Sequence, residues 1–299
     1  MSIINKFIVA SMPYIPKIIV GAVAKRYIAG ITLPDAVKKV KELNNKGMVC
    51  TMDLLGEFVK DASEAKDVLA NILPILKAID EHKLDSNMSI KPTQLGLTID
   101  RELAYNNIKT ILDEARKLNN FVRIDMEDAT TTDQTLNLWR RFHKEGYTNT
   151  GVVIQSYLHR SESDVQTLVK EGATFRLCKG IYNESPSIAF KDRQQIRENF
   201  LKLLQIILES GSYVGIATHD DYLIDGAMAM IKKLGLSKDK YEFQMLLGVR
   251  ESLRDQIVAA GHKLRVYVPY GEQWYAYSTR RLKENPHMAW YITKAIFIR

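Results

Sequence analysis

The chain contains little cysteine, and this shortage excludes two kinds of architecture. Cys50 and Cys178 are its only cysteines, and they lie far apart in 299 residues. Neither belongs to a CxxC motif or to a cysteine and histidine cluster with the spacing of metal ligands. We therefore expect neither a disulfide framework nor a metal site. A reducing, cytoplasmic setting fits this composition.

Long hydrophobic runs are also missing. The most apolar segments are FIVASMPYIP and IIVGAVA, near the start of the chain, and both are shorter than the roughly 18 to 20 residues that span a bilayer. Pro13, Pro16 and Lys17 interrupt the continuous apolar core that a signal peptide requires. We predict no transmembrane segment. Residues 1–46 are expected to form a helical extension that packs on the protein, with peripheral contact at the inner membrane face as the alternative.

Positive charge is plentiful, but it is not concentrated. The net charge of +7 suggests an anionic partner, such as nucleic acid, a membrane surface or a small molecule. No five consecutive lysines or arginines occur, and no nucleic-acid-binding motif accompanies the basic residues. A basic nucleic-acid-binding protein is therefore the least favoured hypothesis, and we expect no nucleic acid partner.

The GxGxxG fingerprint is absent too, which disfavours a doubly wound sheet that binds a dinucleotide through that motif. From Gly47 onward, short β-rich runs alternate with longer segments of helical periodicity, as they do in parallel sheets. A further helix is predicted at 34–45. The pattern predicts an α/β fold, a (βα)8 TIM-type barrel over residues 47–299, with strands at 48–53, 88–91, 121–125, 151–155, 175–179, 214–219, 241–246 and 264–268.

Polar residues close the first six predicted strands. In a barrel these strand ends converge on one face, where active sites are assembled. For any single position the simpler explanation is a strand that exits into solvent. Polar residues at the ends of six successive strands favour a shared site. They are Asp53, Lys91, Asp125, Gln155, Lys179 and His219.

The segment after the last strand, GEQWYAYSTRRLKEN, carries one helical stripe. Its members follow the spacing i, i+3, i+4 and i+7 and are Tyr277, Arg280, Arg281 and Glu284. A solvated Arg/Glu face is the ordinary explanation, worth about 0.3 to 0.5 kcal/mol per pair. If the stripe instead overhangs the barrel mouth, its two guanidinium groups match a carboxylate. Together with Lys91 and with apolar surface from Leu246, Tyr267 and Tyr277, they predict a pocket for a small carboxylate with an apolar body.

The segment FRLCKGIYNE offers a second group of candidates. Arg176 and Lys179 belong to the predicted strand at 175–179, and Gly180 after it allows a ligand to approach the backbone closely. A Schiff-base lysine, Lys179 or Lys91, would instead make the protein a barrel lyase or aldolase. Asp125 could orient the arginine pair or balance its charge, and Glu127 and Asp128 remain alternatives for that role.

Taken together, KGIY, IATH, YEFQML and YxYxxRRLxEN resemble the proline dehydrogenase family in its single-domain bacterial form, from about Asp53 to Pro286. The resemblance implies an FAD-dependent barrel that oxidises L-proline to Δ1-pyrroline-5-carboxylate by hydride transfer and passes electrons to a membrane quinone. It also implies a role in proline catabolism and transient contact with pyrroline-5-carboxylate dehydrogenase.

The resemblance also assigns residue roles. It implies that Asp125 is the active-site aspartate and that Arg176 lies beside the reactive nitrogen of the flavin, where a cation stabilises negative charge. The substrate residues it implies are Lys91, Arg280 and Arg281 for the carboxylate, Leu246, Tyr267 and Tyr277 around the ring, and Glu284, which closes the last motif. The remaining flavin contacts it implies are Met126, Gln155, Lys179, Gly180, Ile181, Thr218 and His219.

Three positions differ from residues that are frequent in the family. Ile181 stands in place of alanine, Asn183 in place of tryptophan and Asp220 in place of asparagine. These differences concern the fit of the flavin and not the grip on the carboxylate. Hydroxyproline oxidation is the close alternative, and Tyr267 argues against it because a bulky ring leaves little room for an added hydroxyl.

Overall fold

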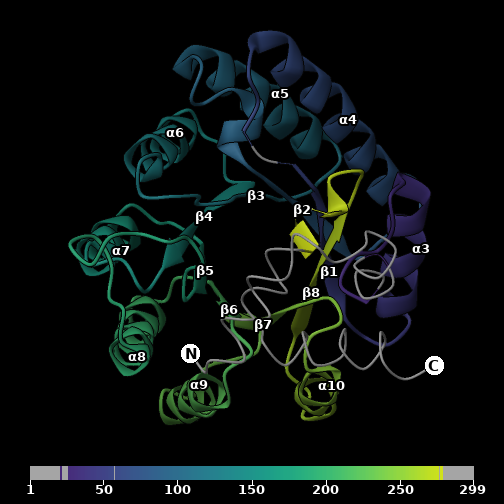
Figure 1. Ribbon diagram of the computed structural model, residues 1–299. Coiled ribbons are helices and arrows are strands. Elements are labelled where there is room, and N and C mark those ends of the chain that lie inside the picture. Colours follow the sequence, from purple (N-terminus) through teal and green to yellow (C-terminus); the bar gives the residue numbers. More distant parts are fainter. Residues whose placement is uncertain (1–20, 22–25, 57, 276, 279–299) are drawn as a thin grey trace, which may run out of the picture.

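A closed barrel of parallel strands forms the centre of the molecule, and helices surround it (Figure 1). The computed structural model describes residues 21, 26–56, 58–275 and 277–278. Each strand pairs with the next, and β8 pairs back with β1. The barrel prediction is confirmed. The strands are β1 Val49–Leu54, β2 Ser86–Ile90, β3 Val122–Ile124, β4 Thr150–Gln155, β5 Phe175–Cys178, β6 Val214–Ala217, β7 Tyr241–Leu246 and β8 Leu264–Tyr270.

Several helices begin at residues whose side chains cap them. Thr32 and Asp35 form a reciprocal capping box at the start of α3, and Asp61 and Asp100 accept backbone N–H groups at the starts of the next two α-helices. The predicted helix at 34–45 corresponds to α3. The helices are α3 Leu33–Asn44, α4 Ala62–Glu81, η2 Pro92–Leu95, α5 Arg101–Lys117, α6 Thr132–Lys144, α7 Ser161–Lys170, α8 Arg193–Glu209, α9 Asp221–Lys233 and α10 Glu251–Ala259.

Several strands end one or two residues before the predicted position. Lys91 follows β2 because Pro92 has no N–H to donate to a neighbouring strand and starts η2 instead. His219 likewise lies beyond the end of β6. At the other extreme, β8 continues to Tyr270, which pairs with Leu54 of β1. Lys91, Asp125, Lys179 and His219 therefore lie at the beginnings of the loops above the barrel, whereas Asp53 and Gln155 belong to β1 and β4.

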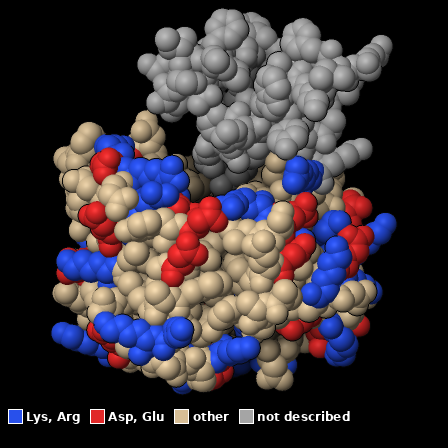
Figure 2. Space-filling view, turned by 90° about the horizontal axis from the view of Figure 1, so that it is seen from below, with Lys and Arg blue, Asp and Glu red and all other residues tan. Residues whose placement is uncertain are grey.

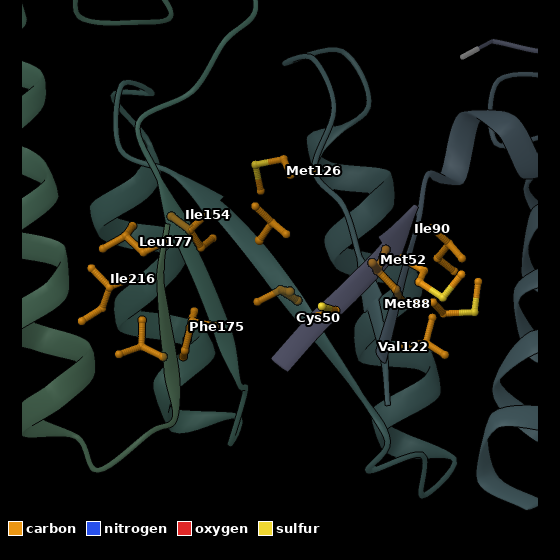
Figure 3. Close-up of a cluster of buried hydrophobic side chains, with 14 of the residues drawn as sticks. Cys50, Met52, Met88, Ile90, Val122, Met126, Ile154, Phe175, Leu177 and Ile216 are labelled. Carbon is orange, nitrogen blue, oxygen red and sulfur yellow. The ribbon is translucent and has the colours of Figure 1, made fainter. Parts of the chain in front are cut away.

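The two faces of the barrel strands differ sharply in polarity. In β5, Phe175 and Leu177 belong to the buried apolar cluster shown in Figure 3, whereas Arg176 between them points to the other face. In β7, Phe243 likewise separates Glu242 from Gln244. Barrel interiors are usually filled by branched apolar residues. Here they hold charged and amide side chains, whose buried partners are described below.

Charged residues on the outer surface are mixed in sign. In the face seen in Figure 2, lysine and arginine alternate with aspartate and glutamate, as the dispersed sequence pattern predicts. In the part of the chain that the structure describes, no helix is both long and apolar enough to cross a membrane.

The segment leading into α3 is attached to the end of the last strand. The N–H of Ala29 donates to the carbonyl of Pro269 at 2.9 Å, and the N–H of Gly271 donates to the carbonyl of Gly30 at 3.1 Å. Most of the predicted N-terminal extension, residues 1–20 and 22–25, lies outside the described residues. Its division from the barrel at residue 46 stays a prediction.

Candidate active site

A cavity of about 680 Å³ opens at the carboxyl ends of the strands, a volume typical of small-molecule sites. All six residues predicted from the strand ends line it, and they are Asp53, Lys91, Asp125, Gln155, Lys179 and His219. A second hollow, of about 720 Å³, lies between α3 and α4, where the lysines Lys38, Lys41 and Lys77 are solvent-exposed. The cavity at the barrel mouth is the candidate site because buried charges line it.

Arg176 and Asp125 form the centre of the site. An Nη1 of Arg176 lies 2.6 Å from Oδ1 of Asp125, and Nη2 donates to Oγ of Ser89 at 3.0 Å. Nε donates to Oε1 of Gln244 at 2.7 Å. The hydroxyl of Tyr267 donates to Oδ2 of Asp125 at 3.0 Å. The structure thus brings together both residues predicted to be catalytic. Hydrogen bonds with Ser89, Gln244 and Tyr267 hold the pair in place.

Lys91 is paired with a carboxylate that the sequence did not assign to it. Its Nζ lies 2.5 Å from Oδ1 of Asp53, and that aspartate side chain is 2% exposed. Burial alone would lower the pKa of Lys91, but the charges of Asp53 and Asp125 outweigh it and raise that pKa. An ammonium group has three donors, so a pair with Asp53 still leaves capacity for a ligand carboxylate. A raised pKa disfavours Schiff-base chemistry at Lys91, which needs the neutral amine.

A cluster of cations gathers around Asp220 at the rim of the cavity. Asp220 accepts hydrogen bonds from Lys179 at 3.2 Å, from Arg193 at 3.5 Å and from Arg197 at 2.7 and 3.0 Å. Lys179 and Arg193 also line the cavity. Three cations on one carboxylate leave an excess of positive charge, which suits a ligand with an anionic group. The sequence reasoning missed Arg193 and Arg197, which enter from the first turns of α8.

The Asp220 cluster predicts a distinct acid dependence. Burial would raise the pKa of Asp220, but the hydrogen bond from Arg197 and the charge of Lys179 hold it well below its usual value. The stability that Asp220 contributes is therefore complete above about pH 3.9 and is lost as the pH falls toward the lowered value. We expect Asp220→Asn to cost about 3 kcal/mol at pH 7. Urea titrations should show this loss shrinking by about 1 kcal/mol at pH 3.

Asp221 provides the matched control for this prediction. It is the next residue in the chain and is paired with Arg250 at 2.6 Å, but its side chain is 62% exposed. Asp221→Asn should change stability little at either pH, because solvent screens an exposed pair. Equal losses in the two variants would contradict a special role for the Asp220 cluster.

The other predicted flavin residues also reach the cavity. The amide of Gln155 donates to the carbonyl of Glu127 at 2.7 Å. The N–H of Leu246 donates to Nε2 of His219 at 2.9 Å, which fixes that ring with its proton on Nδ1. Gly180 has a φ of +105°. The predicted residues that line the cavity with these are Met126, Ile181, Thr218, Tyr267 and Tyr277.

Part of the predicted substrate stripe lies outside the described residues. Arg280, Arg281 and Glu284 belong to that part, whereas Tyr277 is described and buried. Asp125 was one candidate to orient that arginine pair, a role that stays a prediction, and in the structure it is paired with Arg176. Glu127, left open as an alternative, accepts from the N–H of Thr93 at 2.9 Å and from its hydroxyl at 2.5 Å. It thereby connects the loops that follow β2 and β3.

Comparison with known proteins adds independent findings. The model of the family described as "Proline dehydrogenase" matches residues 36–292. Proline dehydrogenase 1 of Bacillus subtilis subsp. natto is 38% identical over 273 residues, covering 91% of this chain and 90% of that protein. The proline dehydrogenase of Deinococcus radiodurans is 34% identical over 277 residues, covering 91% and 89%.

Among solved structures, the fold resembles that of proline utilization A from Bdellovibrio bacteriovorus inactivated by N-propargylglycine. The TM-score is 0.82 at 24% identity, and the match covers 93% of this chain and 34% of that longer one. The chain therefore spans about a third of that protein, and at this identity the likeness concerns the fold.

Proposed function

The chain belongs to the proline dehydrogenase family, and we propose that it oxidises L-proline to Δ1-pyrroline-5-carboxylate by hydride transfer to FAD. As a family member it is an oxidoreductase of proline catabolism. We further propose that the electrons pass to a membrane quinone and that the product passes to pyrroline-5-carboxylate dehydrogenase through transient contact. The observation that supports this best is that two cations, the half-buried Lys91 and the buried Arg176, line one cavity together with Asp125.

Lys91 is proposed to hold the substrate carboxylate. It is charged and paired with Asp53, so it offers a preorganised cation in the cavity. The resemblance adds Arg280 and Arg281, which lie outside the described residues. Leu246, Tyr267 and Tyr277 are proposed to surround the ring. Because Asp125 holds the hydroxyl of Tyr267, that ring cannot easily swing away, which disfavours hydroxyproline as substrate.

The residues of the cavity fit FAD. Lys179 and Arg193 at the rim suit its pyrophosphate, and Gly180 presents backbone without a side chain. Bound FAD would supply the acceptor for two electrons and a proton. Arg176 is proposed to lie beside its reactive nitrogen and to favour negative charge there, and Gln155 is proposed as a further contact. Ile181 lines the cavity and is 45% exposed, and it is proposed as an apolar contact of the flavin.

The decisive experiment is an absorption spectrum of the purified protein with and without substrate. We expect a yellow protein whose flavin bands are bleached by L-proline in the absence of oxygen. A colourless protein that takes up no flavin on reconstitution would overturn the proposal. The lyase alternative predicts a different result, namely an adduct on Lys179 or Lys91 that borohydride traps whether or not FAD is present.

A further inference from the structure

A continuous line of hydrogen bonds runs down the barrel interior from Arg176. Its Nε donates to Oε1 of Gln244 at 2.7 Å, and Nε2 of Gln244 donates to Oε1 of Glu242 at 2.7 Å. Glu242 in turn accepts from Arg265 at 2.6 and 3.1 Å. All four side chains are buried. Only Arg176 and Gln244 of these four line the cavity, so Glu242 and Arg265 lie beneath the site.

The order of donors and acceptors in this line gives it a direction. The amide of Gln244 has a donor end and an acceptor end, and only the acceptor end suits Arg176, because a guanidinium group has donors alone. Glu242 decides which end is presented. As a carboxylate it can only accept, so it binds the NH2 end of Gln244 and turns the oxygen toward Arg176.

Glu242 keeps its charge in this buried position. Burial alone would raise the pKa of Glu242, but Arg265 and Lys263 outweigh it and lower that pKa to about 2. Nε of Arg265 lies 2.6 Å from Oε1 of Glu242, and Nζ of Lys263 lies 3.4 Å from its Oε2. At the pH values at which proteins are handled, Glu242 therefore acts only as an acceptor.

The neighbouring strand leaves room for this arrangement. Gly215 of β6 pairs with Glu242 of β7. A Cβ atom at Gly215 would lie 2.1 Å from Nε2 of Gln244 and 2.6 Å from its Cδ, closer than real side chains approach. The amide of Gln244 thus occupies the space that a side chain at this strand position would fill. The absence of a side chain at Gly215 is therefore a condition for the amide of Gln244 to lie where it does.

We propose that Glu242 is a positioning residue which, through Gln244, fixes the guanidinium of Arg176 at the active site. The importance of Arg176 for catalysis rests on the proposed function, whereas its orientation by Gln244 does not. A long arginine side chain has many rotamers. Its charge stabilises a bound anionic group effectively only when the guanidinium is held in one position. The line of bonds supplies that place from below, while Asp125 and Ser89 hold the other two nitrogens.

The test compares Gln244→Met, which keeps the size of the side chain, with Glu242→Gln, which keeps its shape. In protein labelled with 15N arginine, the Nε–H signal of Arg176, assigned through Arg176→Lys, reports the hydrogen bond directly. We expect its hydrogen exchange to be at least about tenfold faster in both variants, because a buried donor exchanges slowly only while its bond persists. An unchanged exchange rate in a folded Gln244→Met variant would overturn the proposal even if Glu242→Gln fails to fold.

Two further variants separate positioning from general damage. Lys263→Met removes a cation beside Glu242 without touching Gln244, so it should leave the exchange of Arg176 unchanged. The exchanged pair Glu242→Gln with Gln244→Glu places an acceptor against Arg176 again and keeps the total charge. It should restore the slow exchange. Fast exchange in Lys263→Met, or no restoration in the exchanged pair, would indicate a loosened barrel and overturn the proposal.

A second measurement uses the enzyme with FAD bound. In Gln244→Met we expect kcat to fall about tenfold with KM for L-proline nearly unchanged, because Arg176 is not assigned to the carboxylate. The equilibrium constant for flavin reduction should fall about tenfold, which is about 30 mV for a two-electron couple. A wild-type protein without flavin would refute the proposed function, and the exchange measurement would still decide the role of Gln244.

Discussion

Lys91→Met should lower kcat/KM for L-proline several-hundredfold, mainly by raising KM. The variant removes a cation, only 16% exposed, that the substrate carboxylate is proposed to contact, and truncating one partner of such a pair costs about 2 to 5 kcal/mol. A group that holds the substrate equally in the ground and transition states changes KM more than kcat. Steady-state kinetics measure this split. An unchanged KM would refute the assignment of Lys91 to the carboxylate.

The same variant should also be less stable, for a separable reason. Without Lys91, the carboxylate of Asp53 is left 2% exposed and without its cation, which costs about 3 to 5 kcal/mol. Burial already raises the pKa of Asp53, and losing the opposing charge of Lys91 would raise it further. A group with a raised pKa is protonated as the pH falls, so the loss measured by urea titration should be smaller at pH 5 than at pH 7.

An exposed ion pair provides the control for both effects. Lys109 and Asp113 lie 2.7 Å apart on the outside of α5, with side chains 41% and 39% exposed. Lys109→Met makes the same chemical change far from the cavity. It should leave KM unchanged and stability nearly so, because solvent already screens both charges. Comparable changes in KM and in stability in both variants would show that the effect of Lys91 comes from the total charge of the protein and not from its position in the cavity.

The fold was predictable because one pattern repeats. Runs such as 151–155 and 241–246 are short and rich in β-branched or aromatic residues, and helical segments separate them, so the number and order of strands follow from the sequence. The topology then brings the strand ends together without further information. That step placed Asp53, Lys91 and Asp125 at one cavity before any contact was known.

The hydrogen-bond partners of the site residues were not predictable, because they depend on distances across the barrel. No sequence rule pairs Arg176 with Gln244, which lies 68 positions away. The sequence did contain one unused signal. In YEFQML, Glu242 and Gln244 alternate with aromatic and apolar residues, and strand periodicity places both on the inner face. The cations of α8 were missed for another reason, since arginines in the first turns of an amphipathic helix look like ordinary surface residues.

Gly180→Ala should remove most of the FAD that the cavity is proposed to bind and lower the free energy of unfolding by about 3 kcal/mol. Two costs add at this position. The φ of +105° is one that residues with a side chain rarely adopt, and the added Cβ would lie 2.2 Å from Cδ1 of Tyr157. The ring cannot retreat easily, because Tyr157 is buried and both its N–H and its carbonyl are hydrogen-bonded, to Lys179 and Phe190.

Gly211→Ala is a control that separates the backbone strain from the steric clash. Its φ is +77° and nothing lies within 4 Å of a Cβ added there, so Gly211→Ala carries backbone strain of about 1 kcal/mol without a clash. The excess loss in Gly180→Ala therefore measures the contact with Tyr157, and combining it with Tyr157→Ala should recover part of that excess in a double-mutant cycle. Flavin content, read from the ratio of visible to ultraviolet absorbance, should fall only in the Gly180 variant. Because Gly180 lies between Lys179 and Ile181 on the cavity wall, full flavin content in a destabilised Gly180→Ala protein would mean that this loop supports the fold and not the cofactor.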